Sequence, residues 1–83
     1  MSRLFFHLRD GVDHLLDPEG IELPNLEAAK AHAVKAAYCL MAGDVAHGKL
    51  NLKYRIDIED GAGSILATVH FRDLVEIMEH EPS

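Results

Sequence analysis

The amino-acid sequence predicts a small α+β domain in which an antiparallel sheet carries one main helix on one face, with the element order β-β-α-β-β(-α). The first observation is an alternation of residue classes over 50–59 and 65–71, which is typical of strands with one buried and one wet face. The second is the alanine-rich segment 26–42, which contains neither proline nor glycine. The third is a set of glycine-containing turns between short strands.

The chain before the helix is expected to form two strands and an extended segment. Residues 3–9 alternate as a strand does, and the Asp-Gly pair at 10–11 is a strong turn signal. Residues 12–16 can return as a short second strand. A second turn, Asp-Pro-Glu-Gly over 17–20, leads into the extended residues 21–23 before a proline.

The main helix is predicted over 26–42. Asn25 is a good N-cap because its side-chain oxygen can accept a free backbone N–H, and Gly43 suits the left-handed position after the last turn. A narrow apolar stripe at helical spacing should face the sheet, formed by Leu26, Ala29, Ala33, Ala36, Ala37 and Leu40.

The chain after the helix is predicted to form a hairpin and a short helix. The strands 50–59 and 65–71 flank a turn at 60–63, a C-terminal helix follows over 74–78, and residues 79–83 are expected to fray. The side chains expected to face the main helix are Phe6, Tyr54, Ile56, Val69 and Phe71.

Length, charge and cysteine count bound the class of protein. The 83 residues allow one domain, 1–83, whose core is small, so dimerisation would be a natural way to add burial. The net charge of −6 opposes binding to nucleic acid. A single cysteine, Cys39, excludes an intramolecular disulfide, and no apolar run is long enough for a membrane span. We therefore expect a cytoplasmic protein with no membrane association.

Two stretches of the sequence carry a family resemblance. They are Leu-Phe-Phe-His-Leu-Arg-Asp-Gly over 4–11 and Asp-Pro-Glu-Gly-Ile-Glu-Leu-Pro-Asn-Leu-Glu-Ala-Ala over 17–29. Both resemble the DUF6894 family, short bacterial proteins frequent in rhizobia and their relatives. The chain departs from the family pattern at Leu4, where tyrosine is usual, at Pro18, and at Asn25, where asparagine keeps the capping role. The resemblance implies a small cytoplasmic bacterial protein, and it brings no established activity and no catalytic residues.

The usual signatures of chemistry are absent from the sequence. The six histidines lack the spacing of metal ligands, and none pairs with Cys39 at zinc-ligand spacing. His32 lies two helical turns from Cys39, about 10 Å along the axis, which is too far for a direct hydrogen bond. The glycine turn at 60–63 lacks the lysine and the following helix of a phosphate loop. We predict no catalytic residue, no cofactor and no metal.

Two surfaces are left as candidates. The sheet face away from the helix should carry basic, aromatic and imidazole side chains that could hold an anion or stack a base, namely Phe5, His7, Arg9, Arg55 and His70. A second stripe on the helix, Val34, Tyr38 and Met41, could contact another chain. Each surface also has an ordinary explanation, as a solvated face or as a stripe covered by neighbouring segments.

Three functional hypotheses follow. The favoured one is a non-enzymatic interaction module, self-associating as a homodimer through the Val34, Tyr38 and Met41 stripe or through an edge of the sheet. The alternative is a domain that binds a small ligand or nucleic acid on the outer sheet face. An enzyme is the least favoured, because so small a sheet with one main helix offers little concavity.

Overall fold

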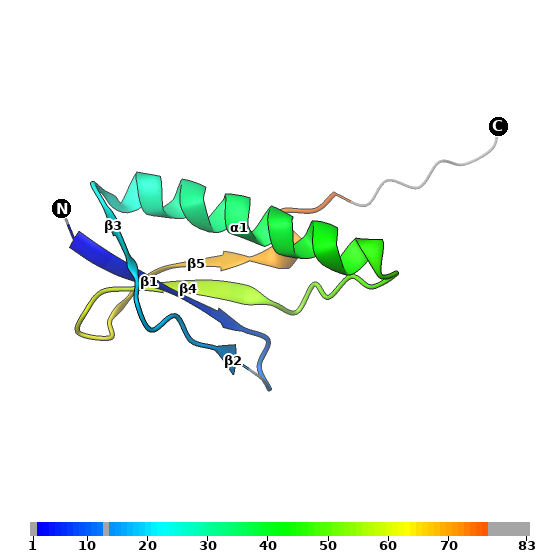
Figure 1. The fold of residues 1–83 in the computed structure, drawn as a ribbon, viewed down its shortest axis with the longest axis horizontal. Helices are drawn as coiled ribbons and strands as arrows, with labels where there is room; N and C mark the ends of the chain where they lie inside the picture. Colours follow the sequence, from blue (N-terminus) through cyan, green and yellow to red (C-terminus); the bar gives the residue numbers. More distant parts are fainter. Residues whose placement is uncertain (1, 13, 77–83) are drawn as a thin grey trace.

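The fold is built on a five-stranded antiparallel sheet, seen in a computed structural model that describes residues 2–12 and 14–76 (Figure 1). Four strands follow the order β2-β1-β4-β5, and β3 also pairs with β1. The element order is therefore β-β-β-α-β-β, which confirms the predicted α+β class and adds one strand. The strands are β1 (Ser2–Arg9), β2 (His14–Leu15), β3 (Ile21–Leu23), β4 (Arg55–Glu59) and β5 (Ile65–His70).

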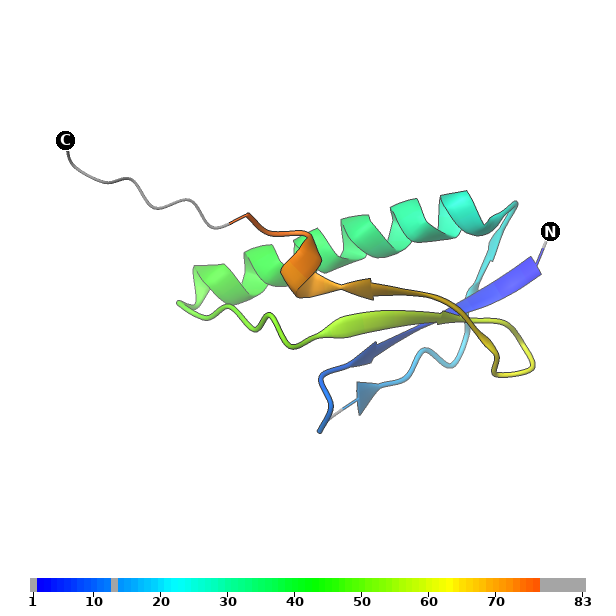
Figure 2. The same cartoon turned by 180° about the vertical axis from the view of Figure 1, so that it is seen from behind.

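The one α-helix of the described residues, α1 (Leu26–Ala46), lies across one face of the sheet and contacts β3, β4 and β5 (Figures 1 and 2). The Asn25 side chain accepts the backbone N–H of Ala28 at 2.8 Å, so the predicted N-cap is confirmed. Small side chains let the helix approach the sheet closely, and they meet one buried layer of larger residues. This core consists of Ala29, Ala33, Ala37 and Met41 from α1 with Leu4, Ile56, Ile58 and Phe71.

The helix continues beyond the predicted end at Gly43. Ala46 is its last residue, and the left-handed glycine after it is Gly48, with φ of 76°. A glycine inside a helix costs only about 1 kcal/mol relative to alanine. The helix therefore continues through Gly43 as far as Ala46. The buried stripe is also rotated from the predicted one: Met41 is buried, whereas Leu40 is 45 % exposed.

The C-terminal hairpin is shorter than predicted. Residues 50–54 precede the strand as a turn, in which Asn51 Oδ1 accepts the backbone N–H of Lys53. A register shift between Ile58 and Glu59 sets Ile65 opposite Glu59, so Ile65 faces away from the helix and breaks the alternation predicted over 65–71.

A 3-10 turn, η1 (Phe71–Asp73), follows β5 directly (Figure 2). Its first residue, Phe71, is buried in the core. Residues 74–76 are not helical, so the described part of the predicted helix 74–78 is wrong. The rest of that helix and the frayed end predicted over 79–83 lie outside the described residues. Of the helices that the structure describes, none has the length and apolarity needed to cross a membrane.

Candidate functional site

The outer face of the sheet gathers the five side chains that the sequence predicted for it. Antiparallel pairing places Arg9 opposite Arg55 and Arg55 opposite His70, so these three share one row. His7 and Phe5 follow along β1 on the same face, and their rings are stacked with centroids 6.3 Å apart. The predicted grouping of side chains is therefore present.

Two carboxylates lie at the centre of this face, so its charges are mixed and not purely basic. Asp57 stands opposite His7 and Glu59 opposite Phe5 in the β1–β4 pairing. The sequence indicated a solvent-facing position for both residues, yet Asp57 is only 2 % exposed and Glu59 only 8 %. That expectation is wrong because Arg9 and His7 of β1 lie against these carboxylates.

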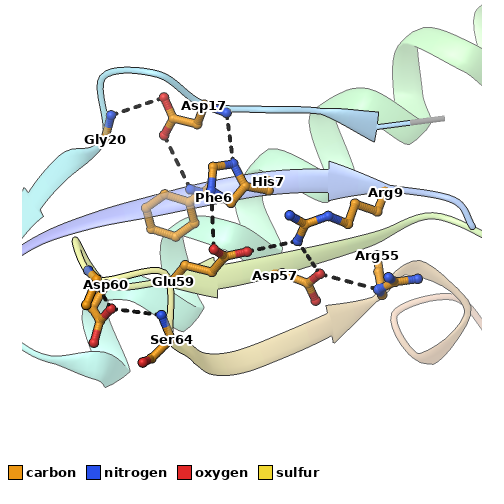
Figure 3. A network of polar contacts seen from close by, with 11 residues as sticks. Phe6, His7, Arg9, Asp17, Gly20, Arg55, Asp57, Glu59, Asp60 and Ser64 are labelled. Carbon is orange, nitrogen blue, oxygen red and sulfur yellow. Dashed lines mark hydrogen bonds and ion pairs between the residues drawn. The ribbon is translucent and has the colours of Figure 1, made fainter.

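Arg9 is the centre of the resulting ion-pair network (Figure 3). Its Nη1 donates to Asp57 Oδ2 at 2.6 Å and to Glu59 Oε2 at 2.9 Å. Arg55 Nε lies 3.4 Å from Asp57 Oδ2, and the Thr68 hydroxyl donates to Asp57 Oδ1 at 2.9 Å. Hydrogen bonds to Glu59 and to Asp57 raise the pKa of Arg9 above its ordinary value.

Asp57 remains ionised despite its burial. Burial by itself favours the neutral acid, but the hydrogen bonds from Arg9 and Thr68 and the nearby charge of Arg55 outweigh it. The pKa of Asp57 is consequently held below its ordinary value. Both arginines of the outer face are thus already paired with carboxylates.

His7 is held by a backbone donor. The N–H of Asp17 donates to His7 Nδ1 at 3.0 Å, so in this geometry Nδ1 carries no proton and the ring proton sits on Nε2. That nitrogen faces Glu59 Oε1 at 3.7 Å. The imidazole therefore joins the 17–20 turn to the ion-pair network, as Figure 3 shows.

The Asp17 side chain closes a gap between two strands. β2 pairs with residues 8–9 of β1 and β3 with residues 2–4, and between them Asp17 Oδ2 accepts the Phe6 N–H at 3.3 Å. Asp17 Oδ1 accepts the N–H groups of Glu19 and Gly20. Burial opposes ionisation of Asp17, but the hydrogen bonds from Gly20, Phe6 and Glu19 outweigh it and lower its pKa.

Gly20 completes this turn because no other residue fits there. Its φ is +70°, and a Cβ on it would lie 2.9 Å from the Leu4 carbonyl oxygen. The two stretches that carry the family resemblance therefore meet in space, and their polar residues bind each other.

The outer face offers little room for a ligand. Its hollow, lined by Arg9, Gly11, Val12, His14 and Arg55, measures about 110 Å³, whereas small-molecule sites usually exceed roughly 300 Å³. Within residues 2–12 and 14–76, no three His, Cys, Asp or Glu side chains are grouped so that they could hold a metal ion. Cys39 is exposed on α1.

The three residues of the predicted helix stripe differ in their exposure to solvent. Met41 is only 5 % exposed, so the expectation that it lies on the surface is wrong. Tyr38 is half-exposed, and its hydroxyl donates to the Leu74 carbonyl oxygen at 3.2 Å. Val34 is partly buried and lines a hollow of about 250 Å³ beside β5.

The β5 edge is the feature that sequence reasoning located least well. β5 ends the strand order, so within the described residues no strand pairs with its outer side. Its sequence, Ile-Leu-Ala-Thr-Val-His, contains no Asp, Glu, Lys or Arg, and Ile65 and Leu66 are 57 % and 45 % exposed. The lack of Asp, Glu, Lys and Arg in this segment can be read from the sequence, but its position at the edge of the sheet cannot.

The comparisons with known proteins identify a family. A family model described as Domain of unknown function (DUF6894) matches residues 3–72. Neither the comparison with curated proteins nor that with solved structures yielded a match. The matched range covers the ion-pair network, the 17–20 turn, α1 and β5, and the chain belongs to the DUF6894 family.

Proposed function

We propose that the protein is a non-enzymatic, cytoplasmic interaction module that self-associates through the outer edge of β5. The observation that carries this proposal is the six-residue edge strand itself, which contains no Asp, Glu, Lys or Arg and has no strand beside it in the described chain. An edge of this kind presents a row of backbone donors and acceptors that another strand can satisfy.

The opposite edge is less suited to strand addition. β2 has only two residues, and the 17–20 turn covers the β1 edge between β2 and β3. Proteins commonly protect an edge in such ways, with short strands and covering loops. Within the described residues, β5 has neither protection.

The ligand-binding alternative receives less support. Its arginines already bind carboxylates at 2.6–3.4 Å, so an anion would have to displace Asp57 or Glu59. The net charge of −6 adds a long-range repulsion against nucleic acid. Titration with nucleotides and short single strands is therefore expected to leave the amide signals of His7, Arg55 and His70 unchanged.

Light scattering over a range of micromolar concentrations tests self-association. The chain has a mass of 9.2 kDa, and we expect a molar mass that rises toward twice this value. Thr68→Lys should restore the monomer because like charges then face each other along the joined edge. Ala62→Lys adds the same charge in the exposed turn after β4 and should leave the dimer intact. A wild-type monomer at every concentration would contradict the proposal.

A further inference from the structure

We infer that the partner of β5 is β5 of a second copy, paired antiparallel about a two-fold axis that passes beside Thr68. This inference rests on the proposed self-association and adds its geometry. The result is a continuous sheet through both copies, with both α1 helices on the same side of it.

The direction of the free backbone groups follows from the β4–β5 pairing. The Phe71 N–H donates to the Tyr54 carbonyl at 3.0 Å, which makes these residues a hydrogen-bonded pair. In an antiparallel ladder such pairs alternate, so Val69 and Ala67 also direct their backbone groups toward β4. The N–H and C=O groups of Thr68 and His70 therefore point outward.

An axis at Thr68 pairs residues 66–70 of the two copies. With Thr68 opposite Thr68, each copy's outward N–H donates to the other's outward C=O, and His70 lies opposite Leu66. An axis at Val69 would leave only residues 68–70 of the strand in the pairing, and an axis at Ala67 would draw Ile65, at the register shift, into it. An axis at His70 would run the pairing into η1, where the strand has ended.

The side chains along this edge suit a copy of themselves. On the helix side, Ala67 of one copy would face Val69 of the other, both apolar and partly buried. On the outer side, Thr68 would face Thr68. No like charges stand opposite each other, which is the arrangement that would repel two identical strands.

Charge complementarity favours a second copy over an unrelated strand. Lys30 and Asp73 line the same hollow beside β5. α1 and β5 run in the same direction (Figures 1 and 2). Lys30 is near the start of the helix and Asp73 follows the end of the strand, so the two residues lie toward opposite ends of the hollow. A two-fold axis at Thr68 brings Lys30 of each copy toward Asp73 of the other.

Lys30 and Asp73 are both available to form an ion pair with the second copy. Lys30 Nζ lies 3.9 Å from Glu27, whose side chain is 87 % exposed, and such a surface pair is weak. The Asp73 carboxylate has no hydrogen bond or ion pair within the part of the chain that the structure describes.

Disulfide trapping tests the axis. In a Cys39→Ser background, Thr68→Cys should form a disulfide-linked dimer under mild oxidation, because hydrogen-bonded partners place their Cα atoms about 5.5 Å apart. Ile65→Cys is the matched control: it is exposed on the same strand, but two copies three residues off the axis lie roughly 20 Å apart. We expect several-fold more linked dimer from Thr68→Cys than from Ile65→Cys.

A second measurement uses the wild-type chain, so it does not depend on the cysteine variants folding. A carbodiimide joins an amine to a carboxylate in contact, with loss of water, and mixed labelled and unlabelled chains show whether the link is intermolecular. We expect a Lys30–Asp73 link between copies. A dimer by light scattering that gives neither link would overturn the pairing and leave self-association standing, whereas a monomer would overturn both.

Discussion

The outer face of β1 and β4 and the free edge of β5 belong to the same sheet, but their polar groups are satisfied in opposite ways. On the outer face, Arg9, Asp57 and Glu59 bind one another, and no buried side-chain N or O atom of the described residues lacks a partner. The β5 segment contains no Asp, Glu, Lys or Arg, and no strand of the described chain binds the outward backbone groups of Thr68 and His70. Unused hydrogen-bonding capacity, and not chemical variety, therefore marks the surface that is available to a partner.

The largest expected effect comes from removing Arg9. Arg9→Ala leaves Asp57 and Glu59 buried without their main partner, which should lower the free energy of unfolding by about 3 kcal/mol. Arg55→Ala is the control, because its partly exposed pair at 3.4 Å should contribute below about 1 kcal/mol. Urea unfolding measures both. Equal losses would show that Arg9 is not the centre of the network.

Removal of the Asp17 carboxylate should have the next largest effect. Asp17→Ala frees the backbone N–H groups of Phe6, Glu19 and Gly20, with an expected loss of roughly 2 kcal/mol. Glu19→Ala, at an exposed position of the same turn, should change stability by less than about 0.5 kcal/mol. The prediction fails if the two variants unfold at the same urea concentration.

Acid should weaken the fold through the same two aspartates. Because the pKa values of Asp57 and Asp17 are lower in the folded chain, their contribution is complete above the unfolded value of about 3.9. It shrinks as the pH falls through the folded values, since the unfolded chain takes up protons first. Unfolding free energies between pH 6 and 3 should therefore decline less steeply in Asp57→Asn. An unchanged slope in this variant would contradict the assignment.

The smallest effect is expected at the edge of β5. Lys30→Asp and Asp73→Lys should each weaken dimerisation by about 0.5 kcal/mol, which is roughly twofold in Kd. The two substitutions together exchange the charges and should restore the wild-type affinity. Sedimentation equilibrium in low salt measures these differences. Additive weakening in the double variant would place the two residues apart.

Much of the fold could be predicted from the sequence because its signals are local. The Asn25 cap and the alternation in the two C-terminal strands need only neighbouring residues. The end of α1 was misplaced because Gly43 can be tolerated inside a helix, and the inversion of Ile65 arises from a bulge that alternation alone does not reveal.

The burial and ion pairing within the candidate site could not be predicted, because they depend on contacts between residues that are far apart in the sequence. The side on which Arg9 and Arg55 lie was predicted from alternation. The burial of Asp57 was not, because it depends on Arg9, which is 48 residues away in the chain. The free edge of β5 was equally hidden, since strand order is set by pairing across the whole sheet and not by the composition of one strand.

Residue-resolved amide hydrogen exchange at two protein concentrations tests most directly whether the β5 edge is the binding surface. The N–H groups of Ala67 and Val69 bind β4 and should exchange slowly at both concentrations. Those of Thr68 and His70 should exchange quickly in dilute protein and become protected as the concentration rises. Fast exchange of Thr68 and His70 at both concentrations would contradict the account.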